Sequence, residues 1–515
     1  MSEPSASGIV YLVGAGPGDP GLLTVRGHEL LASCDVIATD ALANPAIIEF
    51  ARLANRGVEV HEVGKRGGSS ESARQDSINE LLVRLGREGR RVVRLKGGDP
   101  FIFGRGSEEA QALHDAGVAF EVVPGVTAGV AAPAYAGIPV THRGVSTSVT
   151  FVTGHEDPLK PDTQTDWAAL ARAGGTIVLY MGVRRLSPIV AALTEGGMSP
   201  DVPAAAIQWG TYARQRTVVA TVSTLVDEVG RAALSAPVII VIGHVVSLRE
   251  EIAWFDRLPL FGRRVVVTRA SAQAAGLRTA LAALGADVLE LPALRVAPLD
   301  AAPLRAALAR IADYEWIVLT SQNAVAECWS ALCAMGLDAR ALAGRRVACV
   351  GRSTSEALLA HGIVADVVPS RFVAEGVLEA LALRDDVRGR RVLYIAAEGA
   401  RDVLPNGLAA MDCVVDIVRA YRTVSDGTGA ESLRIALADE SVDAVTFASA
   451  SAVRGFIDAV GEDLACRALA VSIGPVTSEA IRGAGLTVAR EASEASIDAV
   501  VQAVLDALHQ AAVRA

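Results

Sequence analysis

The sequence lacks any apolar run that approaches the roughly 20 residues needed to cross a lipid bilayer, so it predicts no membrane partner. It also lacks an excess of positive charge, because 48 lysines and arginines stand against 58 aspartates and glutamates, a net charge of −10. Such a chain has no general attraction for phosphate backbones, and we expect no nucleic-acid partner. The polar start contains neither the basic nor the apolar segment of a secretory signal, so we expect no export.

Cysteine is scarce, with six residues among 515, and no two of them form a Cys-x-x-Cys pair. This pattern predicts reduced thiols of a cytoplasmic protein and implies no metal site. Hydrophobic residues nevertheless make up 51% of the chain, which excludes a disordered protein. The length is sufficient for about three to four compact units.

Short β-branched runs alternate with longer Ala/Leu-rich segments of helical spacing along the whole chain. This alternation predicts an α/β protein with mostly parallel sheets. The clearest runs are residues 9–13, 92–95, 176–180, 238–242, 265–268 and 316–320. The charged, proline-containing stretch after the fourth of these runs indicates a boundary. We therefore predict a first domain over residues 1–248, a linker over 249–261 and a second domain over 262–515.

The second domain contains an internal repeat. Residues 320–325 (TSQNAV) resemble 448–453 (ASASAV), and residues 349–357 (CVGRSTSEA) resemble 472–480 (SIGPVTSEA), so the copies recur after 123 to 128 residues. A repeat of this length predicts two similar α/β lobes with a cleft. Hydroxyl side chains that open helices suit an anionic ligand, although the same residues can simply be helix caps.

A glycine-rich turn at residues 14–20 (GAGPGDP) follows the first strand. It is not a dinucleotide fingerprint, because the third glycine comes one residue early and two prolines remove N–H donors. A rigid turn of this kind still suits close approach of a flat ligand.

Three further motifs follow in order: residues 94–106 (RLKGGDPFIFGRG), 124–128 (PGVTA) and 137–143 (GIPVTHR). Together with the first turn they resemble the S-adenosylmethionine-dependent tetrapyrrole methylases, and among these the uroporphyrinogen-III C-methyltransferases. The match runs from about Ile9 to about Val246. The resemblance implies a methylase fold of two α/β subdomains, S-adenosylmethionine as methyl donor, S-adenosylhomocysteine as product and no metal.

The resemblance also implies which residues contact the methyl donor. Singly, each of them could have a structural role, such as a helix cap, a strand-end glycine or a core methionine. These residues are Pro17, Gly97, Gly98, Asp99, Ile102, Thr127, Ala128, Met181 and Gly210.

Asp40 and Lys65 match the positions that this family uses as proton acceptor and proton donor. Methylation of a pyrrole carbon leaves a cation that must lose a proton from a neighbouring carbon, so a positioned base assists the reaction. An ammonium group can steer the carboxylates of the substrate. The alternatives are a helix N-cap for Asp40 and a solvated charge for Lys65.

The repeat, from about Phe261 to the C-terminus, resembles uroporphyrinogen-III synthase. The resemblance implies a bilobed fold and cyclisation of hydroxymethylbilane with loss of water, in which folding of the substrate matters more than acid assistance. Tyr421 matches the family's candidate for assisting departure of the hydroxyl, unless it is a packing tyrosine between the lobes. The residues implied to cradle the carboxylates of the substrate are Thr354, Ser449, Ser451, Thr477 and Ser478.

The two implied activities are consecutive, because the product of the second domain is the substrate of the first. The methylase family also implies a homodimer. One alternative is a different precorrin methylase fused to a non-catalytic tetrapyrrole-binding or sensor module. The sequence leaves open whether siroheme or cobalamin is the destination.

Overall fold

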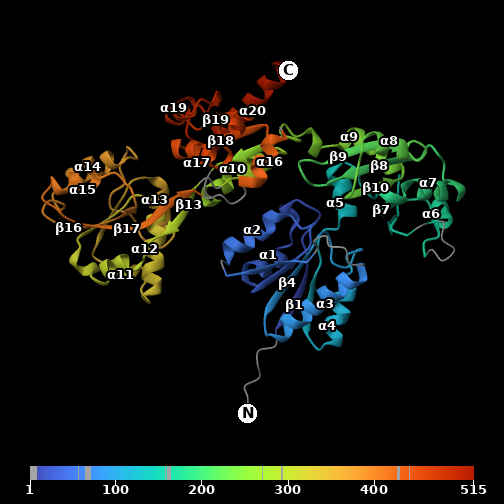
Figure 1. The fold of residues 1–515 in the computed structure, drawn as a ribbon, viewed down its shortest axis with the longest axis horizontal. Helices are drawn as coiled ribbons and strands as arrows, with labels where there is room; N and C mark the ends of the chain where they lie inside the picture. The colour runs from blue at the N-terminus through green and yellow to red at the C-terminus, as the bar shows by residue number, and fades with distance from the viewer. Residues whose placement is uncertain are drawn as a thin grey trace, which may run out of the picture. The chain divides into compact units, whose positions relative to one another are not determined.

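The computed structural model describes residues 8–55, 57–63, 71–156, 158, 164–268, 271–291, 294–425, 430–439 and 441–514. The chain forms two compact units, Met1–Arg264 with Thr279–Val288 and Val265–Arg278 with Leu289–Ala515. The described residues form four five-stranded sheets with helices packed on them, which confirms the α/β class (Figure 1). No helix in these ranges is long and apolar enough to span a membrane.

The first sheet of unit 1 has the strand order β3-β2-β4-β1-β5, and its strand pairs are parallel. Its strands are β1 (Ile9–Gly14), β2 (Val36–Thr39), β3 (Glu59–Glu62), β4 (Arg91–Lys96) and β5 (Ala119–Val123). Helices α1 (Val25–Ser33) and α2 (Pro45–Ala54) pack on one face, and α3 (Glu71–Arg87) and α4 (Gly106–Asp115) pack on the other (Figure 1). Because the strands are parallel, the segments after β1, β2, β4 and β5 meet at one edge.

The second sheet of unit 1 has the order β6-β7-β10-β8-β9 and is mostly antiparallel, with only β6 and β7 parallel. Its strands are β6 (Val149–Thr153), β7 (Thr176–Tyr180), β8 (Pro203–Gln208), β9 (Arg216–Thr221) and β10 (Val238–Ile242). Helices α6 (Trp167–Ala173), α7 (Leu186–Glu195) and α8 (Leu225–Arg231) cover one face, and α5 (Ala128–Tyr135) covers the other. This sheet differs from the predicted, mostly parallel sheets. For the pair β8 and β9 the reason is that only seven residues join the strands, too few for a parallel crossover.

The stretch predicted as a linker is folded against α5. It contains α9 (Arg249–Ile252) and the 3-10 helix η4 (Phe255–Arg257). The indole Nε1 of Trp254 donates to the carbonyl oxygen of Ala134 over 3.0 Å, and the ring of Tyr135 lies 5.1 Å from that of Trp254. The position of the domain boundary itself stays a prediction.

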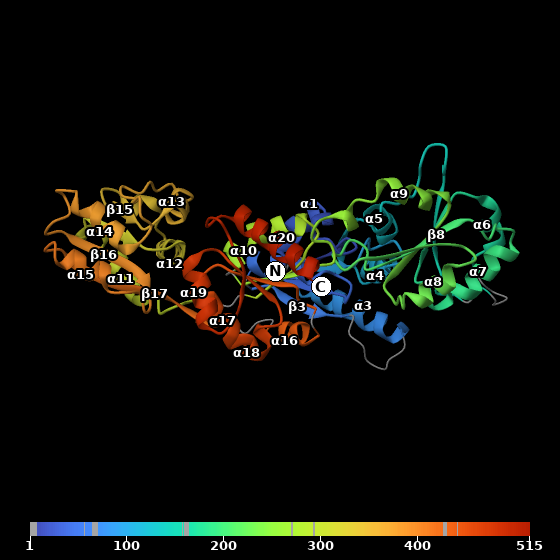
Figure 2. The same cartoon turned by 90° about the horizontal axis from the view of Figure 1, so that it is seen from above.

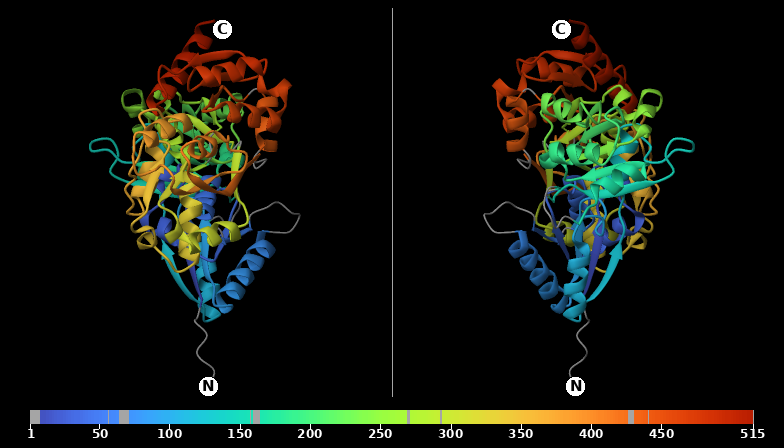
Figure 3. Two further views of the ribbon diagram at one scale, coloured as in Figure 1. Left: turned by 90° about the vertical axis from the view of Figure 1, so that its left-hand side faces the viewer. Right: turned by 90° about the vertical axis from the view of Figure 1, so that its right-hand side faces the viewer.

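One sheet, which lies mostly in unit 2, has the order β12-β11-β18-β19-β20. Its strands are β11 (Arg264–Val267), β12 (Asp287–Glu290), β18 (Ala444–Phe447), β19 (Leu469–Ser472) and β20 (Val488–Glu491). The helices associated with it are α10 (Ser271–Ala283), α16 (Ala430–Ala438), α17 (Ala450–Val460), α18 (Glu462–Ala465), α19 (Pro475–Gly483) and α20 (Ile497–Arg514). The last of these, drawn in red in Figure 3, packs on β19 and β20.

The other sheet of unit 2 has the order β13-β17-β16-β14-β15, and Figure 2 labels its strands β15, β16 and β17. Its strands are β13 (Leu294–Pro298), β14 (Trp316–Leu319), β15 (Arg346–Cys349), β16 (Arg391–Ala397) and β17 (Val414–Ser425). Helices α11 (Ala302–Ala309), α12 (Gln322–Ala334) and α13 (Arg352–Leu359) cover one face, and α14 (Ala374–Ala382) and α15 (Val403–Ala409) cover the other. The repeated motifs of the sequence lie at the strand-to-helix junctions of both sheets.

Candidate functional site

Three glycines bring backbone segments into direct contact at the carboxyl edge of the first sheet. A Cβ atom on Gly125 would lie 2.3 Å from the carbonyl oxygen of Gly98 and 2.7 Å from Cα of Gly14. Gly98 has a φ of +70°, which favours glycine, and its N–H donates to the carbonyl oxygen of Gly16 over 2.7 Å. The three loops thus pack backbone against backbone, and we call this junction of Gly14, Gly98 and Gly125 the glycine cradle.

Asp99 holds this cradle together through its carboxylate. One oxygen accepts hydrogen bonds from the N–H groups of Phe101 and Ile102 over 2.8 and 3.1 Å, and the other accepts one from Gly125 over 3.0 Å. A carboxylate has about four acceptor positions, so one further bond to a ligand is compatible with this geometry. The interactions shown are those of a residue that fixes two loops.

Tyr180 connects the cradle to the second sheet of unit 1. Its hydroxyl lies 2.7 Å from Oγ1 of Thr127 and accepts a hydrogen bond of 2.7 Å from the N–H of Gly129, at the start of α5. Burial raises the pKa of this tyrosine above its ordinary value. Met181, the next residue, has a left-handed backbone with a φ of +55° and a 51% exposed side chain. A large apolar side chain held in this strained conformation is typical of a binding site.

The turn after β1 contacts the loop after β8. The N–H of Asp19 donates to Oγ1 of Thr211 over 3.0 Å, and the hydroxyl of Tyr135 donates to the carboxylate of Asp19 over 2.6 Å. A Cβ on Gly210 would lie 2.2 Å from Cβ of Ala132 in α5. The neighbours of Pro17 and Gly210 are therefore in contact, and the predicted donor-binding residues cluster around one part of unit 1.

Asp40 lies at the carboxyl end of β2 with its side chain 26% exposed. One carboxylate oxygen accepts a hydrogen bond of 3.1 Å from the N–H of Leu42, and the other lies 4.0 Å from Nη2 of Arg94. The N-cap of α2 is Asn44, so Asp40 is not a helix cap in this structure. Lys65, the predicted proton donor, lies outside the described residues.

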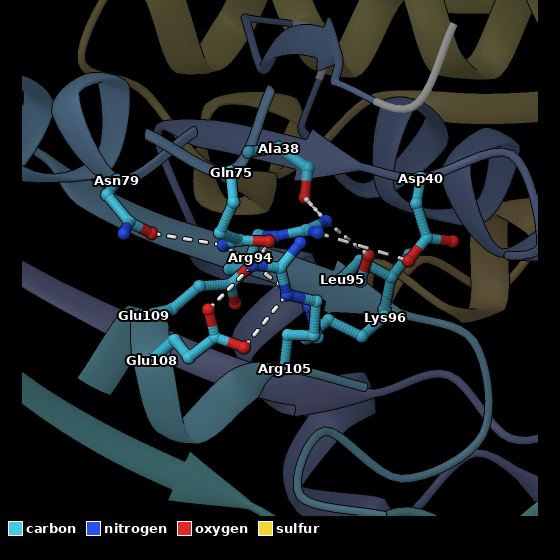
Figure 4. A network of polar contacts seen from close by, with 10 residues as sticks. All are labelled: Ala38, Asp40, Gln75, Asn79, Arg94, Leu95, Lys96, Arg105, Glu108 and Glu109. Carbon is cyan, nitrogen blue, oxygen red and sulfur yellow. Dashed lines mark hydrogen bonds and ion pairs between the residues drawn. The ribbon is translucent and has the colours of Figure 1, made fainter. Parts of the chain in front are cut away.

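A buried cluster of charges lies behind Asp40, and the sequence analysis missed it (Figure 4). Arg94 and Lys96 each approach the same oxygen of Glu109, over 3.0 and 2.9 Å. The side chains of Arg94 and Glu109 are 3% and 0% exposed. The sequence did contain one signal for this cluster. Side chains alternate between the two faces of a strand, so Arg94 and Lys96, two residues apart in β4, lie on the same face of a buried strand.

The pKa of Lys96 lies below its ordinary value, chiefly because burial penalises the ammonium and also because Arg94 is near. Glu109 counteracts this shift, since its carboxylate favours the charged amine. The cluster therefore depends on one buried carboxylate to compensate two cations.

In unit 2, Tyr421 is buried in β17 and its hydroxyl lies 2.7 Å from Oγ of Ser321. Ser321 also caps α12, since its Oγ accepts a hydrogen bond from the N–H of Ala324 over 3.1 Å. Ser449 occupies the corresponding place in the other sheet, where it caps α17 and lies 2.9 Å from Oγ of Ser451. The two copies of the repeat thus share a capping serine at a strand-to-helix junction.

Ser478, another of the predicted substrate-binding residues, is buried. Its hydroxyl is fully buried, lies 2.6 Å from Oγ of Ser472 and donates to the carboxylate of Glu491. Its contact with a substrate carboxylate stays a prediction. Thr354 and Thr477 are also buried, and their role stays a prediction.

Two family models match the chain, one for each half. The family described as Tetrapyrrole (Corrin/Porphyrin) Methylases matches residues 9–226, and the family described as Uroporphyrinogen-III synthase HemD matches residues 275–502.

Curated relatives match one or both halves. The Porphyrin biosynthesis protein HemD of Ruminiclostridium josui is 37% identical over 502 residues, which cover 97% of this chain and 98% of that protein. The Uroporphyrinogen-III C-methyltransferase of Bacillus subtilis is 42% identical over 352 residues, 68% of this chain and 71% of that protein. The S-adenosyl-L-methionine-dependent uroporphyrinogen III methyltransferase of Methanosarcina barkeri is 48% identical over 243 residues, 47% of this chain and 94% of that protein. The chain therefore belongs to the family of bifunctional tetrapyrrole biosynthesis enzymes that join a tetrapyrrole methylase to a uroporphyrinogen-III synthase.

Proposed function

We propose that unit 2 cyclises hydroxymethylbilane to uroporphyrinogen III and that unit 1 methylates this product twice, through precorrin-1 to precorrin-2. The observation that carries the methylation is the glycine cradle beside Asp40, which places closely packed backbone without side chains and a carboxylate in one unit. The family of the chain supports both activities.

The cradle fits S-adenosylmethionine, because its glycines let a ligand approach the backbone closely and the exposed Met181 offers a soft apolar surface. When bound, this cofactor supplies the methyl group. Asp99 and Tyr180 keep the surrounding loops in place. Asp40 accepts the proton that the methylated ring must lose, so each transfer releases one proton.

In unit 2, Tyr421 and Ser321 form a hydroxyl pair at the carboxyl end of the sheet. The leaving hydroxyl of the substrate departs from a resonance-stabilised carbon, so Tyr421 gives modest assistance and the protein mainly holds the chain in a cyclising conformation.

The test supplies the full chain with freshly made hydroxymethylbilane and S-adenosylmethionine without oxygen and identifies the products by mass and isomer type. We expect doubly methylated type III product. Unmethylated type III product would remove the methylase function. Type I product, which forms spontaneously, would remove the synthase function and favour the sensor alternative.

Replacing Tyr421 by phenylalanine is expected to lower kcat for bilane cyclisation by about 3- to 10-fold with little change in KM, because only a hydroxyl that assists departure is lost. Initial rates of type III formation measure the effect. Ser321→Ala is the matched control, since it removes the partner of the tyrosine and should cost less. If Tyr421→Phe forms type III product at the same rate as the parent, Tyr421 is a packing residue and does not assist departure of the hydroxyl.

We further propose that the domains divide at residues 248 and 262, that unit 1 forms a homodimer and that the protein is cytoplasmic. The family resemblance supports the dimer. Sedimentation equilibrium of the full chain at micromolar concentration should give twice the mass of 53.3 kDa.

A further inference from the structure

Arg94 and Asp40 come from adjacent strands and lie on the same face of the first sheet. In the pairing of β2 with β4, Ala38 lies opposite Arg94, so Asp40 follows two residues later on the face that Arg94 shares. Helices α3 and α4 cover this face and exclude water from the side chain of Arg94.

The guanidinium of Arg94 is held from several sides (Figure 4). Its Nε donates to Glu109 over 3.0 Å, and its Nη1 donates to the carbonyl oxygens of Ala38 and Leu95 over 3.3 and 3.2 Å. These contacts leave Nη2 directed toward Asp40 at 4.0 Å. The planar guanidinium makes this arrangement specific, because its nitrogens have fixed directions.

At 4.0 Å the carboxylate of Asp40 is attracted by charge but is too far from Arg94 for a hydrogen bond. Its Oδ2 therefore retains the capacity to accept a proton. Asp99 differs, since backbone N–H groups already occupy both of its oxygens. Asp40 is thus an oriented carboxylate that can accept a proton, whereas Asp99 is a carboxylate that fixes two loops.

Glu109 supports this geometry from behind. Glu109 is fully buried, and its Oε1 receives Arg94, Lys96 and the side-chain amide of Gln75. Two buried cations against one buried carboxylate leave a positive excess, which Asp40 compensates at the open end of the strand. Burying charges costs free energy, and a buried ion pair offsets this cost only where its partners are held in a fixed geometry.

We propose that Arg94 is a positioning residue for methyl transfer, acting through Asp40, and that Glu109 fixes its guanidinium for this purpose. This inference rests on the proposed function, in which Asp40 accepts the proton of the methylated ring. Arg94 is too deeply buried to contact the substrate.

A double-mutant cycle of Arg94→Met and Asp40→Asn in the full chain tests the proposal. Methyl transfer to anaerobic uroporphyrinogen III is followed in single turnovers with a labelled methyl group, so that slow variants are quantified. We expect Asp40→Asn to lower the rate about 100- to 1,000-fold and Arg94→Met about 30-fold. In the Asp40→Asn background, Arg94→Met should cost less than about three-fold, because its effect passes through Asp40.

Lys96→Met is the matched control within the cluster. It removes the same charge from the same oxygen of Glu109 but leaves Arg94 facing Asp40, so we expect a rate within about three-fold of the parent. Calorimetric binding of S-adenosylhomocysteine checks that each variant is folded. If Arg94→Met does not fold, Arg94→Lys replaces it in the cycle, since a lysine keeps the charge but not the planar fork.

Equal losses from Arg94→Met in both backgrounds would overturn the proposal and make Arg94 a structural residue. An equal loss from Lys96→Met would also overturn it, since total charge rather than position would then matter. An Asp40→Asn variant as active as the parent would instead remove the role of Asp40 from the proposed function, and with it the inference. The single variant and the cycle therefore report on the two proposals separately.

Discussion

Replacing Gly125 by alanine is expected to weaken binding of S-adenosylhomocysteine about 100-fold and to lower the free energy of unfolding by about 2 kcal/mol. The new Cβ would lie 2.3 Å from the carbonyl oxygen of Gly98 and 2.7 Å from Cα of Gly14. Both obstacles are backbone atoms, so the loops must separate. Isothermal titration calorimetry and urea denaturation measure the two effects.

Gly230→Ala is the control for this prediction. Gly230 lies in α8 of the same unit, and a Cβ there would meet no atom within 4 Å. We expect unchanged binding and a gain of about 0.5 to 1 kcal/mol in stability, since alanine favours a helix over glycine. Tight binding in Gly125→Ala would contradict the cradle as the cofactor site.

Replacing Glu109 by glutamine is expected to lower the free energy of unfolding by about 3 kcal/mol at pH 7, because two buried cations lose their counter-charge. The deficit should shrink as the pH rises toward 10. Glu109 raises the pKa of Lys96, so its loss lowers that pKa further below the ordinary 10.5. In the variant, the pKa of Lys96 is lower in the folded chain than in the unfolded chain. At pH values between these two pKa values the unfolded chain binds more protons than the folded one, so the stability of the variant rises with pH.

Glu108→Gln provides the matched control on the same helix. Glu108 is 50% exposed and pairs with Arg105 at the surface, and Lys96 is the weakest of the influences on its pKa. Its loss should therefore cost less than about 0.5 kcal/mol and show a much smaller rise with pH. Urea denaturation at pH 7, 8.5 and 10 compares the variants. If the loss of unfolding free energy in Glu109→Gln stays constant across this pH range, Glu109 does not raise the pKa of Lys96 and the prediction is wrong.

The motifs of unit 1 were predictable because they are contiguous. Residues 94–106 contain the glycines, the aspartate and the turn that build one side of the cradle, so their spacing already indicates their chemistry. The Asx turns at Asp99 and Asp40 are equally local, because each carboxylate bonds N–H groups two or three residues ahead. The hydrogen bond that Asp99 accepts from Gly125 was not predictable, because the two residues lie 26 positions apart in the sequence.

The synthase-like repeat shows the opposite case. Position in a motif predicts that Ser478 meets substrate, and the burial of this serine against Glu491 was not predictable from the motif. A helix-opening hydroxyl can cap its helix, face a ligand or bond a neighbouring strand, and local sequence does not distinguish these outcomes.

The sequence by itself determined the α/β class and the family of both halves, because hydrophobic periodicity and contiguous motifs are local properties. Only the tertiary structure decided which charges share a buried space. Arg94 and Glu109 are joined by the packing of α4 on β4, and Asp40 reaches them because β2 pairs in register with β4. Burial then gives these contacts their strength, since charges interact most strongly where water is excluded.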